Sequence, residues 1–342
     1  MKRVGNIYEK ICNRGNILHA HNKAKRGKWH YTEVKYVENN LDECINNIQK
    51  MLEEKKYVLT ADDYAFELIN DKGKERELYK LPYYPHRIIQ WSIVNVILHV
   101  FMKHYIGDTY ASIKGRGVHK AMNKVKRALR HHKDDTKYCL KIDIKKFYPN
   151  INNNILMRKL ERKFKDKDFL DLIRMIIFSR GEKGQPIGSL LSQYLGNFYL
   201  SSFDHYCKER LRLKYYYRYM DDIVILHSSK EYLHNLKRTF DRILDKHFDL
   251  KIKENWQVFP VDSRGIDYVG YRIFRDKIIL RKRIYKNARY SFSRERLHKA
   301  HASYYGWCKH ANVKMFMKKH KVIERLEELK EVKNVSTIQI NK

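Results

Sequence analysis

Two adjacent aspartates, Asp221 and Asp222, stand between two apolar, β-prone segments of the sequence, 217–220 and 223–226. Acids between two such segments predict the turn of a tight hairpin with both carboxylates at its tip. Neighbouring carboxylates at the end of buried strands repel each other unless a cation compensates their charge. Divalent metal ions do so in phosphoryl transfer, so the pair predicts a metal site, with ordinary surface acids in a turn as the alternative.

A metal site of this kind needs a third carboxylate, and Asp143 is the candidate. The alternation of apolar and polar residues over 138–144 predicts a strand that ends near this residue. We expect Asp143 and Asp221 to ligate the metals, the Ile144 main-chain carbonyl to assist and Asp222 to support the site. The predicted chemistry is nucleotidyl transfer with two Mg²⁺ ions, for which Mn²⁺ can substitute. A strand-end acid that caps a turn is the alternative for Asp143.

The chain carries a large positive charge, since 72 lysines and arginines face 39 acids among 342 residues, a net charge of +33. Such a field favours a polyanionic partner, and nucleic acid is the first candidate. The five cysteines are an odd number without a Cys-x-x-Cys pair, which indicates free thiols in a reducing cytoplasm rather than a zinc module. No apolar segment suggests a signal peptide, and 91–102 is too short to span a bilayer, so we expect a buried helix there.

The sequence predicts a polar helix over 41–56 and helices over 87–104 and 119–131. Hydrophobic periodicity predicts a helix over 231–248 and an apolar stripe at four-residue steps within 155–178. Short hairpins are expected over 57–81, with a turn at 71–74, and over 268–283, where apolar residues alternate with basic ones. The basic side of the second hairpin, which includes Arg272 and Arg275, is predicted to face phosphates, and Arg281 and Arg283 are its candidate primer/template contacts. A solvated basic face is the alternative. This order of elements suits an α+β fold with a central antiparallel sheet.

Five blocks in this order resemble the reverse transcriptase core of group II introns, retrons and diversity-generating retroelements, over roughly residues 60–310. The Tyr-Met-Asp-Asp tetrapeptide at 219–222 resembles their catalytic hairpin, so Tyr219 and Met220 are expected near primer or template. The resemblance implies a right-hand polymerase with an antiparallel palm sheet. The N-terminal segment and fingers would comprise 1–137, the palm with an interleaved fingers segment 138–275, and a thumb-like basic helical region 276–342.

Two blocks of this resemblance precede the Asp143 strand. The basic residues at 72–76 resemble a fingers hairpin that holds the incoming triphosphate, and Arg76, with Lys72 or Lys74, is expected to have this role. Exposed lysines in a simple turn are the alternative, and His86 departs from the family pattern, which has an acid there. Arg116 lies between two glycines in a block similar to that of diversity-generating retroelements, where the backbone can approach a nucleotide closely.

The remaining blocks concern the nascent base pair and the primer. Tyr148 occupies the place of an aromatic that excludes a ribose 2′-hydroxyl, although one of Phe147 and Tyr148 is expected in the core. In the block 184–193, Ile187 replaces the usual glutamine, so Ile187 and Gly188 are expected at the nucleotide, or Ile187 only fills an apolar gap. Four further positions are implied as primer or template contacts, namely Ser192, Gln193, Gly270 and Tyr271.

These observations predict an RNA-directed DNA polymerase that makes cDNA from a structured template RNA. The Ile187 variant of the block resembles diversity-generating retroelements, which implies error-prone synthesis, mutagenic retrohoming and a small accessory protein. The alternative is the reverse transcriptase of a retron or of an anti-phage defence system. A non-catalytic RNA-binding protein is a third possibility, which the three acids disfavour. The expected setting is the cytoplasm of a bacterium, with a bacterial or phage gene.

Overall fold

The computed structural model describes residues 3–70, 75–293, 300–324 and 327, and the chain divides into two compact units. The first unit comprises 1–112, 143–212 and 238–254, and the second comprises 113–142, 213–237 and 255–342. Both units are discontinuous in sequence, so the chain passes between them several times. The predicted division into 1–137, 138–275 and 276–342 concerns functional regions and stays a prediction.

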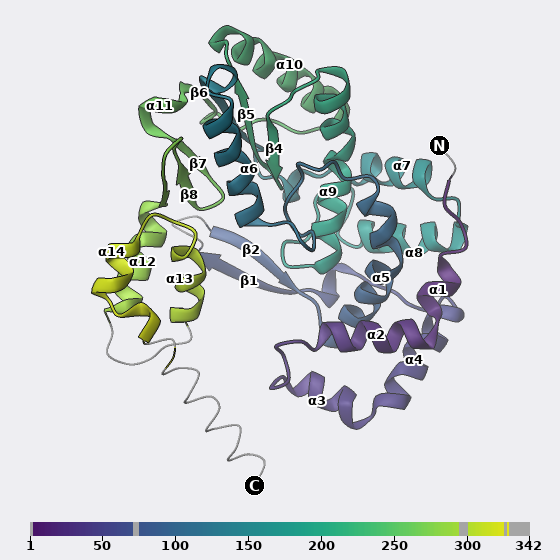
Figure 1. Ribbon diagram of the computed structural model, residues 1–342. Coiled ribbons are helices and arrows are strands. Elements are labelled where there is room, and N and C mark those ends of the chain that lie inside the picture. The colour runs from purple at the N-terminus through teal and green to yellow at the C-terminus, as the bar shows by residue number, and fades with distance from the viewer. Residues whose placement is uncertain (1–2, 71–74, 294–299, 325–326, 328–342) are drawn as a thin grey trace. The chain divides into compact units, whose positions relative to one another are not determined.

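The first unit is mainly helical (Figure 1). Its helices pack around α5 (Ile88–Met102), which is apolar on nearly all sides and is buried over most of its length, as predicted for 91–102. The other helices and short helical turns are α1 (Tyr8–Cys12), α2 (Arg14–Ala24), α3 (Thr32–Asn39), α4 (Leu41–Glu53), η1 (Ala61–Asp63), η2 (Tyr83–Arg87), η4 (Tyr148–Asn150), α7 (Asn153–Lys163), α8 (Lys167–Phe178), α9 (Leu190–His205) and η5 (Tyr206–Arg210). Helix α10 (Lys230–Phe248) begins in the second unit and ends in the first.

A two-stranded hairpin, β1 (Ala65–Asn70) with β2 (Glu75–Lys80), also belongs to the first unit. The strands are antiparallel, with Asn70 opposite Glu75, which confirms the predicted hairpin; its turn at 71–74 lies outside the described residues. Most of its side chains are exposed. Because an isolated two-stranded hairpin is only marginally stable in water, its contacts with the rest of the unit matter for its position.

The second unit carries the larger sheet, whose strands lie in the order β4-β5-β3-β6. Strand β4 (Tyr216–Tyr219) is antiparallel to β5 (Asp222–His227), and β3 (Tyr138–Asp143) is antiparallel to β6 (Gln257–Pro260). Only the last residue of β3, Asp143, is counted with the first unit. The predicted α+β class with an antiparallel sheet is confirmed.

A second sheet in this unit has three short strands, β7 (Ile266–Tyr268), β8 (Tyr271–Ile273) and β9 (Ile278–Leu280). The sequence predicts one hairpin over 268–283, and the structure adds β7 as a third strand. The unit also contains α6 (Val118–His131), η3 (Asp134–Thr136), α11 (Val261–Arg264), α12 (Lys282–Phe292), α13 (Ala300–Cys308) and α14 (Lys314–Lys319). No helix among the described residues is long and apolar enough to cross a membrane.

Candidate active site

The β4–β5 hairpin carries the adjacent aspartates at its tip. The predicted tight hairpin is confirmed, but Tyr219 pairs with Asp222, so the turn consists of Met220 and Asp221, and Asp222 begins β5. Met220 has a φ of 56°, in the left-handed region that residues with a side chain seldom adopt. Tight hairpin turns require positive φ at a central position, and strained backbone of this kind is concentrated at functional sites. The turn therefore presents the carboxylate of Asp221 from a backbone that the surrounding strands must hold in place.

Arg218 supports this turn from inside the protein. The side chain is fully buried, and its guanidinium donates a hydrogen bond of 2.9 Å to the main-chain carbonyl of Met220. A buried guanidinium is costly unless its donors are satisfied, so this residue stabilises the turn only while it remains bonded to it. Arg218 was not predicted from the sequence as a functional residue. An arginine inside an otherwise apolar strand is the signal that could have found it.

Asp143 is the last residue of β3, as predicted, and β3 is the neighbour of β5 in the sheet. The Lys253 ammonium donates a hydrogen bond to the carboxylate of Asp143, and the Lys253 amide donates to its main-chain carbonyl at 2.8 Å. The charge of this carboxylate is thus compensated by a lysine that sequence analysis missed. The segment around Lys253 has no motif that would have drawn attention to it.

A second lysine compensates the negative charge of the β4–β5 hairpin. Lys141 Nζ lies 3.8 Å from the Asp222 carboxylate and also donates a hydrogen bond to the main-chain carbonyl of Asp267. Side chains two residues apart in a strand share a face, so Lys141 and Asp143 lie on the same face of β3. This spacing was visible in the sequence and could have identified Lys141.

The Ile144 carbonyl was predicted as a metal ligand. Ile144 forms an antiparallel bridge with Ile252, flanked by hydrogen bonds of 2.8 Å from Lys145 to Lys251 and from Lys253 to Asp143. This is the pattern of a non-hydrogen-bonded pair, in which the carbonyl of Ile144 points away from the partner segment. The Ile144 carbonyl therefore points to the side of its strand that is opposite Ile252.

Asp143 belongs to the first unit, whereas Asp221 and Asp222 belong to the second. Within the described residues, no group of three or more His, Cys, Asp or Glu side chains is assembled closely enough to hold a metal ion. The convergence of Asp143, Asp221 and Asp222 around metal ions therefore stays a prediction.

The loop that follows α8 is fastened to the segment after β3. Gln185 is buried; its main-chain amide donates to the carbonyl of Tyr148 at 2.9 Å, and its side-chain amide donates to Asn153 at 2.8 Å. Asn153 in turn donates to the carbonyls of Gly181 and Ile177 at 2.7 and 3.0 Å. This network of buried amides fixes the loop beside Tyr148. Asn153 was missed, because a single asparagine carries no recognisable pattern.

Ile187 and Gly188 connect this loop to the β1–β2 hairpin. The carbonyl of Ile187 accepts a hydrogen bond of 2.9 Å from the amide of Tyr79 in β2. Gly188 has a φ of 104°, and a Cβ placed on it would lie 2.8 Å from both the Tyr79 carbonyl and the side chain of Leu78. Only glycine fits at this approach. The half-buried Ile187 side chain is thus held by a backbone that is anchored to the predicted fingers hairpin.

One of the two aromatic residues after Asp143, Phe147, lies in the core, as the sequence predicts. Phe147 is buried, whereas Tyr148 is half-buried, and their ring centroids lie 5.3 Å apart. A Cβ on Gly196 of α9 would lie 3.2 to 3.3 Å from both rings, so the glycine makes room for them. The position of Tyr148 is therefore defined by a close contact with α9 as well as by the Gln185 loop.

Of the residues predicted to contact the triphosphate or the nucleotide, the structure describes Arg76 and Arg116, whereas Lys72 and Lys74 lie outside the described residues. Arg76 is exposed on β2, opposite Ile69. Arg116 stands between Gly115 and Gly117, whose φ values are 75° and 145°, just before α6. No atom lies within 4 Å of a Cβ built on either glycine, so these glycines supply the backbone conformation rather than space within the protein.

The predicted primer and template contacts differ in exposure. Ser192 is buried, whereas Gln193 is exposed and accepts a hydrogen bond of 2.9 Å from Ser112. Tyr219, at the end of β4, and Met220, within the acidic turn, are half-buried. Of these four residues, Gln193 presents the most accessible side chain.

Gly270 and Tyr271 pack against the C-terminal helices. Tyr271 is fully buried, and its hydroxyl donates to the carbonyl of Trp307 at 3.1 Å. A Cβ on Gly270 would lie 2.5 Å from the Trp307 ring, so glycine is required there. Their role as primer contacts stays a prediction, while their observed role is to hold α13 on the three-stranded sheet.

The basic residues after Gly270 have two different roles. Arg281 and Arg283 line an open depression of about 850 Å³ in the second unit, and Arg281 is paired with Asp267 at 2.5 Å. Arg275, in contrast, was wrongly placed on a phosphate-facing side. Its guanidinium bonds the carbonyls of Leu129 and Thr136 and the carboxylate of Asp262, so it serves to join elements of the second unit.

Comparison with known proteins decides the family. The family model described as reverse transcriptase (RNA-dependent DNA polymerase) matches residues 69–273. The chain belongs to the reverse transcriptase family. This match spans Arg76, the 184–193 loop, β3 and the β4–β5 hairpin, and it confirms the predicted enzyme class and right-hand polymerase fold. Reverse transcriptases use divalent metal ions.

Individual relatives are distant. The chain is 27% identical over 228 residues to the Retron Ec73 reverse transcriptase of Escherichia coli. The matched region covers 62% of this chain and 68% of that protein. It is 22% identical over 209 residues to the putative COX1/OXI3 intron 2 protein of Saccharomyces cerevisiae, covering 41% of this chain and 24% of that protein.

Solved structures similar to this chain include the telomerase of Candida albicans in complex with a fragment of telomeric RNA. It has a TM-score of 0.48 and 13% identity, over 64% of this chain and 45% of the telomerase chain. The corresponding complex from Candida tropicalis has a TM-score of 0.47 and 14% identity, over 88% and 58% of the two chains. The chain thus spans about half of the length of these telomerases.

Proposed function

We propose that the chain copies a structured template RNA into cDNA by two-metal nucleotidyl transfer. Asp143 and Asp221 act as the metal ligands, the Ile144 carbonyl assists and Asp222 supports the site. Two observations together carry this proposal. The β4–β5 hairpin has a two-residue turn of Met220 and Asp221, and β3, which lies next to β5 in the sheet, ends at Asp143.

The donor atoms suit Mg²⁺, which prefers carboxylate and carbonyl oxygens. Lys253 and Lys141 compensate the negative charges of Asp143 and Asp222, so these carboxylates are tolerated when no metal is bound. When a metal ion binds, it replaces the lysine as the partner of the carboxylate. When bound, two Mg²⁺ ions lower the pKa of a primer 3′-hydroxyl and neutralise the charge that develops on the leaving pyrophosphate. The chain's own contribution is to hold the carboxylates, through the Arg218 bond to the turn and the strand order of the sheet.

The nucleotide is positioned by residues outside the sheet. Arg76 with Lys72 would hold the triphosphate, and Arg116 would approach the nucleotide from its glycine-flanked turn. The ring of Tyr148, fixed by the Gln185 loop and Gly196, would pack under the sugar and exclude a 2′-hydroxyl, so the product is DNA. Because Ile187 is anchored to β2 through the Tyr79 amide, closure of the hairpin on a triphosphate would also position Ile187 against the nascent base pair.

The replacement of a glutamine by Ile187 supports error-prone synthesis within a diversity-generating retroelement. A branched alkyl group removes a hydrogen bond that checks base-pair geometry, and the loss of ~1–2 kcal/mol of discrimination raises misinsertion about tenfold. The proposed partners are a template RNA, dNTPs and a small accessory protein, and cytoplasmic location is part of the same proposal.

A second setting is favoured by the similarity to the Escherichia coli retron enzyme. In it the chain would be the reverse transcriptase of a retron or of an anti-phage defence system. The neighbouring genes separate the two settings. A variable-protein gene with an imperfect repeat supports the retroelement, whereas an effector or toxin gene supports the retron or defence system.

Primer extension on poly(rA) with an oligo(dT) primer tests the activity. Wild type is expected to extend the primer in the presence of Mg²⁺, and Asp221→Ala is expected to bind the duplex without extending it. Asp134→Ala is the matched control, since Asp134 is an exposed acid of η3 and is outside the proposed site. Equal extension by wild type and Asp221→Ala would refute the proposal.

A further inference from the structure

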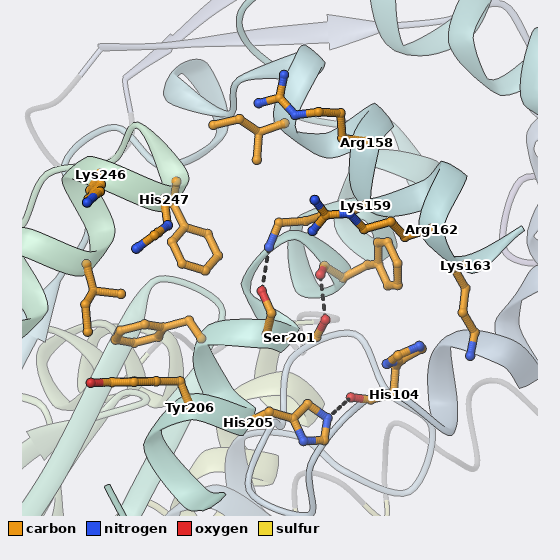
Figure 2. Close-up of a pocket in the computed structure, with 16 residues that line it drawn as sticks. His104, Arg158, Lys159, Arg162, Lys163, Ser201, His205, Tyr206, Lys246 and His247 are labelled. Atoms are coloured by element: carbon orange, nitrogen blue, oxygen red, sulfur yellow. Dashed lines mark hydrogen bonds between the residues drawn. The ribbon is translucent and has the colours of Figure 1, made fainter. Parts of the chain in front are cut away.

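A basic depression lies in the first unit and is separate from every residue of the proposed active site. It has a volume of about 840 Å³ and is formed mainly by α7, α9 and α10. Figure 2 shows the basic residues of α7, including Arg158, Arg162 and Lys163, along one side and Lys246 and His247 of α10 on the other. A hollow of this size is in the range that holds a ligand of one or two nucleotides.

All charged side chains of the lining are basic, since it contains no aspartate or glutamate. Arg158, Arg162 and Lys246 are exposed, and none of them forms an ion pair with a carboxylate among the described residues. Basic side chains on a surface are usually interspersed with acids, and a concave site of one sign concentrates the field. The depression is therefore suited to an anion, and guanidinium groups suit phosphate in particular.

One lysine forms part of the floor. Lys159, labelled in Figure 2, extends from α7 into the depression. Its ammonium donates to the carbonyl of Tyr199 at 2.9 Å and to the hydroxyl of Ser202 at 2.5 Å, which leaves one of its three N–H donors. Its ammonium also lies 4.2 Å from the centre of the Phe248 ring. Burial, with a contribution from Arg162, lowers the pKa of Lys159 to about 7. A phosphate in the depression would favour the charged form and gain a further hydrogen bond.

The remaining surface of the depression is apolar and partly accessible. Tyr206, Ile155 and Ile243 line it and are half-buried. An aromatic ring beside cationic groups is the combination with which proteins bind single-stranded nucleic acid, since the phosphates meet the cations and a base stacks on the ring. A free inorganic anion would use only the cations and leave this apolar surface unoccupied.

We propose that this depression binds a single-stranded segment of RNA, with phosphates at Arg158, Arg162 and Lys246 and a base against Tyr206. Only the source of the RNA rests on the proposed function, in which it is the template RNA that the polymerase carries. No residue of β3, β4 or β5 lines the depression, so this contact anchors the RNA at a point outside the catalytic strands.

The test measures binding of a fluorescently labelled, unstructured oligo(rU) by anisotropy, with an unlabelled primer–template duplex present in excess to fill the polymerase site. The double variant Arg158→Ala/Arg162→Ala is expected to weaken binding about tenfold. It should also reduce the slope of log Kd against log salt by about 1.4, because two phosphate contacts on a single strand are lost. Lys10→Ala/Lys35→Ala removes the same charge from exposed positions outside the depression and is expected to change neither quantity by more than a small fraction.

A second measurement does not depend on the stability of a variant. RNA that contains 4-thiouridine is irradiated with the wild-type protein, and crosslinks are expected in the peptide that contains Tyr206. Equal loss of binding in both double variants, or crosslinks elsewhere only, would overturn the proposal. Displacement of the RNA by tripolyphosphate at micromolar concentration would also overturn it, because the site would then prefer a small polyphosphate.

Primer extension on the annealed duplex is measured with the same preparations and is expected to be unchanged in Arg158→Ala/Arg162→Ala. If wild type fails to extend the primer but the binding difference and the crosslink are found, the proposed polymerase function fails while the RNA site stands. If extension is normal and the double variant binds oligo(rU) as wild type does, only the RNA site is refuted.

Discussion

Replacement of Gly188 by alanine should detach the β1–β2 hairpin from the loop that carries Ile187. The glycine has a φ of 104°, which costs a residue with a side chain about 1–3 kcal/mol. Its Cβ would also lie 2.8 Å from the main-chain carbonyl of Tyr79, and a backbone atom cannot move aside as a flexible side chain can. If β2 shifts to relieve this contact, the Tyr79–Ile187 hydrogen bond breaks, which costs about 1 kcal/mol. The overpacking that remains costs about 1–3 kcal/mol more.

Gly181 offers a matched control. Its φ is 98°, nearly that of Gly188, but no atom lies within 4 Å of a Cβ built on it. Gly181→Ala therefore incurs the backbone strain alone, whereas Gly188→Ala incurs the strain and the contact with β2. The difference between the two variants is about 2–4 kcal/mol and is concentrated in the hairpin, because an exposed two-stranded hairpin can separate without global unfolding.

Native-state hydrogen exchange at the Tyr79 amide measures this difference. We expect exchange at least about 30-fold faster in Gly188→Ala than in Gly181→Ala, since 2 kcal/mol corresponds to that factor. The KM for dNTP should rise in Gly188→Ala only, because Arg76 lies on the same strand. Equal exchange rates in the two variants would refute the close packing of this loop on β2.

Further predictions concern fidelity, sugar selection, the acidic turn and pH. Ile187→Gln is expected to lower misincorporation opposite template adenine about tenfold, scored by sequencing cDNA; an unchanged error rate would mean that the side chain only fills space. Tyr148→Val should admit ribonucleotides, and a primer-extension assay with rNTPs that shows no gain would contradict its role at the sugar. Arg218→Met keeps the side chain's bulk but removes the donor to the Met220 carbonyl, so extension should fall at least about tenfold in a protein that remains folded by circular dichroism, and normal activity would show that the turn holds without it. Burial lowers the pKa of His104 to about 4, below its unfolded value near 6.5, so the unfolded state binds protons more tightly and stability falls as the pH decreases from about 6.5 toward 4. His104→Gln should reduce this loss in urea unfolding curves, and an identical pH dependence in the variant would contradict the assignment.

The sequence predicted the elements whose patterns are local. The helix over 91–102 is apolar on nearly all sides, and the strand before Asp143 alternates, so both patterns are visible in a short window. The acidic pair between β-prone segments predicted the hairpin, although its turn lies one residue earlier, at Met220 and Asp221, because Asp222 pairs with Tyr219. The apolar stripe within 155–178 proved to continue across a break, where Asp166 caps α8 by accepting a hydrogen bond from the Phe169 amide at 3.1 Å.

What the sequence did not reveal depends on contacts between distant segments. Lys253 reaches Asp143 from a position 110 residues later in the chain, and Arg275 bonds carbonyls about 140 residues earlier. Gly270 and Tyr271 were assigned to the primer by resemblance, but their burial against Trp307 arises from the docking of α13. Charge alone cannot tell a lysine that compensates a carboxylate from one that awaits a phosphate, since both are basic residues beside apolar ones.

The most direct test of the central claim is to ask whether Asp143 and Asp221 hold the same metal ions. With Fe²⁺ in place of Mg²⁺ and with ascorbate and peroxide present, the bound metal cleaves the backbone near its ligands. We expect cuts both at the end of β3 and at the Met220–Asp221 turn, and we expect either Asp143→Asn or Asp221→Asn to abolish both. Cleavage at only one of the two places, or cleavage at the turn that survives Asp143→Asn, would contradict a shared metal site.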